Sequence, residues 1–189
     1  METITRPFSS QAEFQAWLAE NYATQEELWM KLYKKDSDQP SITYKEALDV
    51  ALCYGWIDSL KRPGGEDFWL QRFTPRKAKS VWSKVNQGHI ARLTEAGHMQ
   101  PAGLAEVEKA KQDGRWEAAY ASSSTMEFPD DFLEALAKNP AAEEFFETLN
   151  KTNKYAIFYR LQSAKKAETR QRRLEQFIEM LANGEKLYP

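Results

Sequence analysis

The spacing of apolar and polar residues predicts both helices and strands in the first third of the chain. A helix capped by Ser9 or Ser10 carries Phe14 and Leu18 at helical spacing. Residues 27–35 then alternate between apolar and polar side chains, which is typical of a strand with one buried face.

A helix and a hairpin are predicted next. The Thr43-Tyr44-Lys45-Glu46 sequence forms a capping box that begins a helix, and Gly55 ends it. Two segments rich in aromatic and β-branched residues, 56–61 and 67–73, flank Pro63-Gly64-Gly65. Glycines at this position favour a tight turn, so the two segments are interpreted as a β-hairpin.

Beyond the hairpin the apolar period becomes helical and stays helical. Ser80 is expected to cap a helix that Gly97 ends, and Pro101 opens another that runs through Lys111. The serines at 122–124 form the best candidate linker. Further helices are predicted over residues 129–138, 140–149, 153–161 and 164–183.

These elements predict an α+β fold, with a small antiparallel sheet flanked by helices and followed by a C-terminal helical subdomain. We place the domain boundary in the serine cluster, which gives an α+β domain over residues 1–124 and a helical domain over residues 125–189. The chain has no repeat of fixed period, so solenoid architectures are excluded.

Composition narrows the class of protein. The chain has 189 residues, of which 42% are hydrophobic, and no apolar run approaches the length of a membrane span. The N-terminal residues lack the pattern of a secretory signal, and the single Cys53 cannot form an intrachain disulfide, so we expect a cytoplasmic protein. Neither of the two histidines belongs to a metal-binding motif, and no cofactor motif is present. The oligomeric state is left open.

Charge is sorted along the chain although the formal net charge is only −2. Residues 68–94 hold six Lys or Arg residues and no Asp or Glu. Such cations usually just solvate an exposed surface. The alternative is an anion site, because cations before a helix start lie beside unpaired N–H groups and the positive end of the helix dipole. Its candidate residues are Arg72, Arg76, Lys77, Lys79, Ser80, Ser83 and Asn86.

A second group of polar residues surrounds the end of the helix that begins at Thr43. Asp58 is a candidate for a general base or an ion-pair partner, and an enzyme would use it with Tyr44 or Cys53. Arg170 lies on the apolar side of the last helix, so we expect it to need a carboxylate partner, either Asp58 or Glu46. Cys53 is expected to be a buried, inert thiol, because it lies at a helix C-terminus, where the dipole raises a thiol pKa.

Several stretches together resemble the YdeI/OmpD-associated, or bacteriocin-protection, family. They are Tyr33-Lys34-Lys35, Tyr44-Lys45-Glu46-Ala47, residues 51–58, Gln71-Arg72-Phe73-Thr74-Pro75-Arg76, Ser80-x-Trp82-Ser83-x-x-Asn86, Gly97-x-Met99, Asp113-Gly114-Arg115-Trp116 and Ala164-Lys165-x-x-Glu168-Thr169-Arg170. The resemblance covers nearly the whole chain, with Ser59 and His98 as mild departures. It implies a first half similar to the YjbR/CyaY-like superfamily and a role in protection against bacteriocins or cationic peptides. It supplies no catalytic residues.

We therefore expect a non-enzymatic protein of bacteriocin or stress tolerance that binds a small anionic or phosphorylated ligand at its basic site. One alternative is a nucleic-acid-binding protein that uses the basic residues of 68–94 and 165–173 as one surface. The other is an enzyme with a pocket centred on Asp58.

Overall fold

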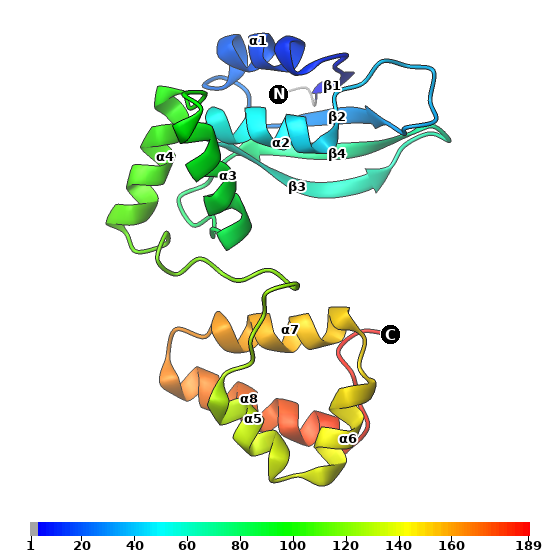
Figure 1. Ribbon diagram of the computed structural model, residues 1–189, viewed down its shortest axis with the longest axis vertical. Coiled ribbons are helices and arrows are strands. Elements are labelled where there is room, and N and C mark those ends of the chain that lie inside the picture. Colours follow the sequence, from blue (N-terminus) through cyan, green and yellow to red (C-terminus); the bar gives the residue numbers. More distant parts are fainter. Residues whose placement is uncertain (1–3) are drawn as a thin grey trace. The chain divides into compact units, whose positions relative to one another are not determined.

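The structure is a computed structural model, and it describes residues 4–189. The chain divides into two compact units, Met1–Ala119 (unit 1) and Tyr120–Pro189 (unit 2), as Figure 1 shows. Unit 1 combines a sheet with helices, whereas the described elements of unit 2 are all helices. The predicted α+β class is confirmed.

The four strands of unit 1 form one sheet in the order β1 (Ile4–Pro7), β2 (Leu28–Tyr33), β4 (Phe68–Pro75), β3 (Trp56–Pro63). Strands β2, β4 and β3 are antiparallel, as expected, but β1 pairs in parallel with β2, so the sheet is mixed. Sequence analysis missed β1, because four residues are too short to show a period and their pairing partners lie more than 20 residues away.

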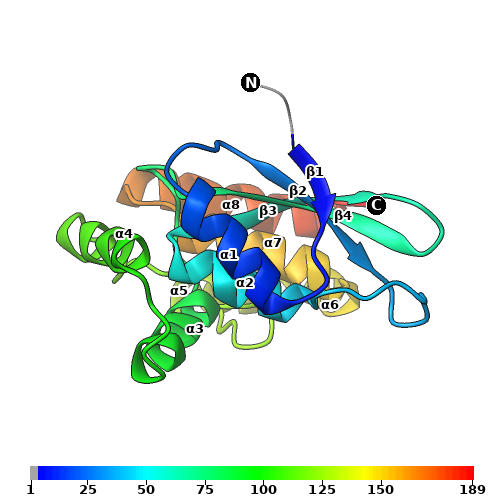
Figure 2. The ribbon, with the colours of Figure 1, turned by 90° about the horizontal axis from the view of Figure 1, so that it is seen from above.

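Helices α1 (Gln11–Asn21) and α2 (Tyr44–Cys53) cover one face of this sheet, which we call the inner face (Figures 1 and 2). Ser10 caps α1, and the predicted capping box of Thr43 and Glu46 begins α2. The apolar face predicted for β2 is confirmed, since its inner-face side chains Leu28, Met30 and Leu32 are completely buried, although Trp29 on the other face is also only 7% exposed.

Helices α3 (Lys84–Glu95) and α4 (Pro101–Gln112) follow the sheet and pack against α2. The expectation that Ser80 caps α3 is wrong, because Ser83 is the N-cap and its hydroxyl accepts the N–H of Asn86 at 3.1 Å. Ser80 instead closes a tight turn, where its Oγ accepts the N–H of Lys77 at 2.9 Å. Both serines satisfy the sequence rule for a cap, and the turn decides between them.

Unit 2 contains four helices, α5 (Asp130–Ala137), α6 (Pro140–Thr148), α7 (Lys151–Gln162) and α8 (Ala167–Ala182). Each lies within a few residues of its predicted range. They bury a core of their own, built around Phe132, Ile157, Leu161 and Leu181. Within residues 4–189, no helix has the length and apolarity that crossing a membrane requires.

Candidate functional site

The first cation of the predicted anion site is neutralised inside unit 1. Arg72 lies on β4, and its Nε and Nη2 lie 2.7 Å and 2.6 Å from one carboxylate oxygen of Glu27, just before β2. Both side chains are about one quarter exposed. An arginine already paired with a carboxylate has little remaining attraction for a soluble anion, so Arg72 contributes little to such a site.

The second cation is buried. Only 8% of Arg76 is exposed, and its guanidinium carbon lies 3.5 Å from the ring centre of Trp82. Its Nη1 donates to the carbonyl oxygen of Val81 at 3.2 Å. Trp82 is itself only 1% exposed and belongs to the hydrophobic core of unit 1. Arg76 therefore anchors the segment between β4 and α3 by a cation–π contact and does not reach the surface.

The lysines of the same stretch have a different environment. Lys77, Lys79 and Lys84 are all exposed, and none of them forms an ion pair within the described part of the chain. Ser83 is only 8% exposed, and its hydroxyl accepts the backbone N–H of Asn86, so these two residues fix the start of the helix. What remains for an anion is Lys77 and Lys79, around the turn before α3, and Lys84, the first residue of α3.

The polar side chains expected near Asp58, those of Tyr44 and Glu46, form hydrogen bonds within unit 1. Tyr44, at the first turn of α2, donates its hydroxyl proton to Oδ2 of Asp58 on β3 at 2.7 Å. Burial, and then this hydrogen bond, raise the pKa of Tyr44. Glu46 accepts from the backbone and hydroxyl of Thr43 at 2.9 Å and 2.7 Å, which lowers its carboxyl pKa. The carboxylate of Glu46 is therefore part of the capping box of α2.

The predicted partners of Arg170 are wrong. Arg170, on α8, binds Asp131 on α5 through both of its terminal nitrogens, one of them 2.8 Å from Oδ1. The guanidinium lowers the pKa of the Asp131 carboxyl. The expected partners, Asp58 and Glu46, lie in unit 1, whereas Asp131, in the first turn of α5, lies in unit 2, as does Arg170 on α8. Helical spacing gave the correct direction for Arg170 but contained no information about which helix it faces.

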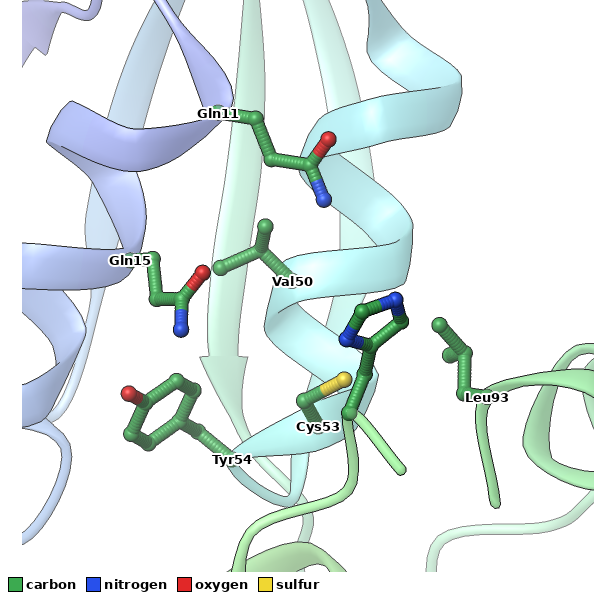
Figure 3. A pocket seen from close by; sticks show the side chains of 7 residues that line it. Gln11, Gln15, Val50, Cys53, Tyr54 and Leu93 are labelled. Atoms are coloured by element: carbon green, nitrogen blue, oxygen red, sulfur yellow. The ribbon is translucent and has the colours of Figure 1, made fainter. Parts of the chain in front are cut away.

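A small pocket of about 70 Å³ lies between the helices of unit 1. Figure 3 shows Cys53 and Tyr54 from the end of α2, Gln11 and Gln15 from α1, and Leu93 from α3 around this pocket. His98 also lines it. Cys53 is buried, and this burial, followed by the negative charge of Asp49, raises its thiol pKa to about 11. The expected burial of this thiol is confirmed, and its raised pKa favours the unreactive protonated form.

A buried carboxylate lies next to this pocket and connects two helices. Asp49 of α2 is 8% exposed, and one of its oxygens lies 2.9 Å from Nδ1 of His89 and 2.6 Å from Nη2 of Arg92, both on α3. Neither this cluster nor the pocket was predicted. Asp49 lies 40 residues from His89, and the only local signal of the cluster is the three-residue spacing of His89 and Arg92 on one helix.

Comparison with known proteins gave two family matches. A family model described as a domain of unknown function (DUF8412) matches residues 6–106. A second, described as "Bacteriocin-protection, YdeI or OmpD-Associated", matches residues 125–184. No curated protein and no solved structure shows a significant match. The expected resemblance to the YdeI/OmpD-associated family is thus supported for the C-terminal part, and neither match supports the YjbR/CyaY-like superfamily.

Proposed function

We infer that this chain, which belongs to the family described as a domain of unknown function (DUF8412), is a binding protein that acts in bacteriocin or stress tolerance. The tolerance role rests on the match of residues 125–184 to the bacteriocin-protection family. The activity we propose for unit 1 is the binding of a small anionic or phosphorylated ligand at the basic stretch.

One observation carries the ligand proposal. Lys77, Lys79 and Lys84 are exposed and belong to a stretch of the sequence without acidic residues. Arg76 and Ser83 are buried on either side of the turn, so the backbone that presents these lysines is held in place. Lysine ammonium groups near free N–H groups of a helix start attract phosphate.

An enzymatic role has less support. Asp58 accepts the Tyr44 hydroxyl, and the small pocket of unit 1 includes neither residue. The raised pKa of Cys53 keeps its thiol protonated at neutral pH, which disfavours nucleophilic chemistry. We therefore favour binding without catalysis.

A thermal-shift screen of the full chain tests the ligand class. Nucleotides, phosphosugars, inorganic phosphate and neutral sugars would be compared at matched ionic strength. A phosphorylated ligand at 100 times its dissociation constant stabilises the folded state by about 2.7 kcal/mol, which is several degrees of melting temperature. A panel in which no anion raises the melting temperature would contradict the proposal.

A charge-reversal pair locates the site. The K77E/K79E variant is expected to lose the thermal shift, because it replaces two attractive charges by two repulsive ones. The K45E/K186E variant changes the net charge equally at two other exposed lysines and should keep the shift. An equal loss of the thermal shift in both variants would mean that anion binding depends only on the net charge of the protein.

A growth assay tests the tolerance role separately. A bacteriocin-sensitive bacterium that expresses the full chain should survive a higher bacteriocin dose than one with an empty vector. The K77E/K79E strain should lose that advantage. If the unchanged protein binds the ligand but gives no protection, the tolerance role is wrong and the binding activity stands.

A further inference from the structure

The face of the sheet opposite α1 and α2, which we call the outer face, has a distinctive set of side chains. Because successive residues of a strand point to opposite faces, and Leu28, Met30 and Leu32 point inward, their neighbours in β2 point outward. The strand register then assigns the partners of these neighbours to the same face. The outer face contains Trp29, Lys31, Tyr33, Arg62, Phe68, Leu70 and Arg72.

Within residues 4–119, no helix covers this face. Helices α1 and α2 lie on the inner face, and α3 and α4 pack against α2 (Figures 1 and 2). Three of its aromatic or apolar residues, Tyr33, Phe68 and Leu70, are partly exposed, and Arg62 is exposed. Within unit 1, these side chains are accessible to a partner.

Cations and rings alternate across the outer face. The Arg62 side chain crosses β4 to place its guanidinium carbon 4.5 Å from the ring centre of Trp29. Lys31 places its Nζ 5.3 Å from the ring centre of Phe68, and Phe68 meets Tyr33 edge-to-face with ring centres 5.7 Å apart. These contacts span the three strands β2, β4 and β3.

The outer face is also electropositive. The outward positions of the paired strands contain no Asp or Glu. Glu27, which precedes β2, binds Arg72, so that pair is neutral. Lys31 and Arg62 form no ion pair among residues 4–189, which leaves two cations beside aromatic rings.

We propose that the outer face of the sheet binds single-stranded nucleic acid. Flat rings offer stacking surfaces to unpaired bases, and nearby cations contact the phosphates that link them. Phe68 and Tyr33 stack with bases, while Lys31 and Arg62 contact phosphates, and movement of Arg62 toward a phosphate uncovers Trp29. A small phosphate would use the cations alone, and a duplex hides its base faces, so the combination of rings and cations favours a single strand.

This inference is independent of the anion site at Lys77 and Lys79, and the tests distinguish them. Binding of the full chain to a fluorescently labelled oligothymidine of about 16 nucleotides is measured by anisotropy at several salt concentrations. The affinity should fall with salt, with a slope of about 0.7 per phosphate contact on logarithmic axes.

Substitution of the two cations tests the phosphate contacts. The K31Q/R62Q variant should bind about 10-fold more weakly near 0.1 M salt and show a shallower salt dependence. Lys61 provides the matched control, since it neighbours Arg62, is also exposed and points to the inner face, 4.9 Å from the ring centre of Trp69. K61Q should keep the affinity of the unchanged protein, and an equal loss in K61Q and R62Q would overturn the proposal.

Substitution of the rings tests stacking. The Y33L/F68L variant keeps apolar bulk at both positions, and should bind about fivefold or more weakly with its salt slope unchanged. A circular-dichroism spectrum checks that it is folded. An unchanged affinity in folded Y33L/F68L, or tighter binding to a duplex of equal length, would overturn the assignment.

The K77E/K79E variant completes the design. This variant should lose binding of the small anion and keep binding of the oligonucleotide. The K31Q/R62Q variant should keep binding of the small anion and bind the oligonucleotide more weakly. Loss of oligonucleotide binding in K77E/K79E alone would assign the polymer to the basic stretch and overturn the outer-face proposal. Failure of the full chain to bind any oligonucleotide at about 50 mM salt would overturn it as well.

Discussion

Cys53 illustrates how its surroundings decide the chemistry of a single side chain. The sequence places it at the C-terminal end of a helix, and the tertiary structure adds burial and the negative charge of Asp49. All three disfavour the thiolate, and the thiol pKa rises to about 11. A thiol in this state reacts slowly even though it lines a pocket.

This environment predicts slow, pH-dependent labelling of Cys53. In the native protein, a thiol reagent such as a disulfide-based chromogen should react far more slowly at pH 7.5 than after denaturation in urea. The native rate should rise as the pH approaches 11, because the thiolate fraction grows there. Absorbance kinetics measure both rates, and complete native labelling at pH 7.5 within seconds would contradict the raised pKa.

The basic stretch shows what one sequence pattern leaves undecided. Arg72, Arg76 and Lys79 look alike in the sequence, as cations in a run without acids. In the structure Arg72 binds Glu27, which lies 45 residues earlier, and Arg76 is buried against Trp82. Arg92 is exposed but binds Asp49, whereas Lys77, Lys79 and Lys84 are exposed and form no ion pair within residues 4–189. Local pattern therefore identified the charged segment but could not assign a partner to each charge, because the partners are distant in the sequence.

At the scale of elements, two glycines in the consecutive helices α3 and α4 differ in the space around their Cα atoms. A Cβ on Gly103, in α4, would overlap the carbonyl oxygen of Cys53 and lie 2.8 Å from that of Leu52. Gly103 thus allows α4 to approach the end of α2 closely. A Cβ on Gly88, within α3, would meet nothing within 4 Å.

These surroundings predict stability changes of opposite sign. G103A should destabilise the protein by about 1–3 kcal/mol or more, because backbone atoms must move. G88A, the matched control, should stabilise it by up to about 1 kcal/mol, because alanine favours the helical backbone. Urea unfolding of both variants measures the free energies. A neutral G103A would mean that α4 does not pack on α2 at this distance.

Element boundaries were predictable where the signal was local. The capping box of Thr43 and Glu46 contains its own partners, so α2 began where expected. The N-cap of α3 is Ser83 and not the predicted Ser80. Ser80 is held in the preceding turn, where its carbonyl oxygen accepts a hydrogen bond from Nη1 of Arg115 at 3.0 Å. That contact joins residues 35 positions apart. Inspection of a few neighbouring residues in the sequence cannot predict this contact.

At the scale of the whole molecule, the chain buries two separate hydrophobic cores. The cluster of unit 1 includes Phe14, Met30 and Trp56, and the cluster of unit 2 includes Phe132 and Phe177, with no residue in common. Each core has its own helices, and the ion pair of Arg170 with Asp131 closes within unit 2. Each unit thus has the contacts that a folding unit requires.

We therefore predict that residues 120–189 fold alone. The fragment should give a helical circular-dichroism spectrum and a cooperative thermal transition. Within it, F132A should lower the free energy of unfolding by about 3–5 kcal/mol, because Phe132 is completely buried, whereas L133A should cost much less, since Leu133 is 45% exposed. A fragment without a cooperative transition would show that its core is insufficient by itself.

The sequence by itself determined the class of the fold, most helix positions, the apolar face of β2 and the segment in which positive charge gathers. These properties depend on spacing and on neighbours a few residues away, which a sequence displays directly. The tertiary structure alone decided that β1 joins the sheet, that Arg170 pairs with Asp131, and that rings and cations share the outer face. Such pairings bring together residues far apart in the chain, and packing of the folded units selects them.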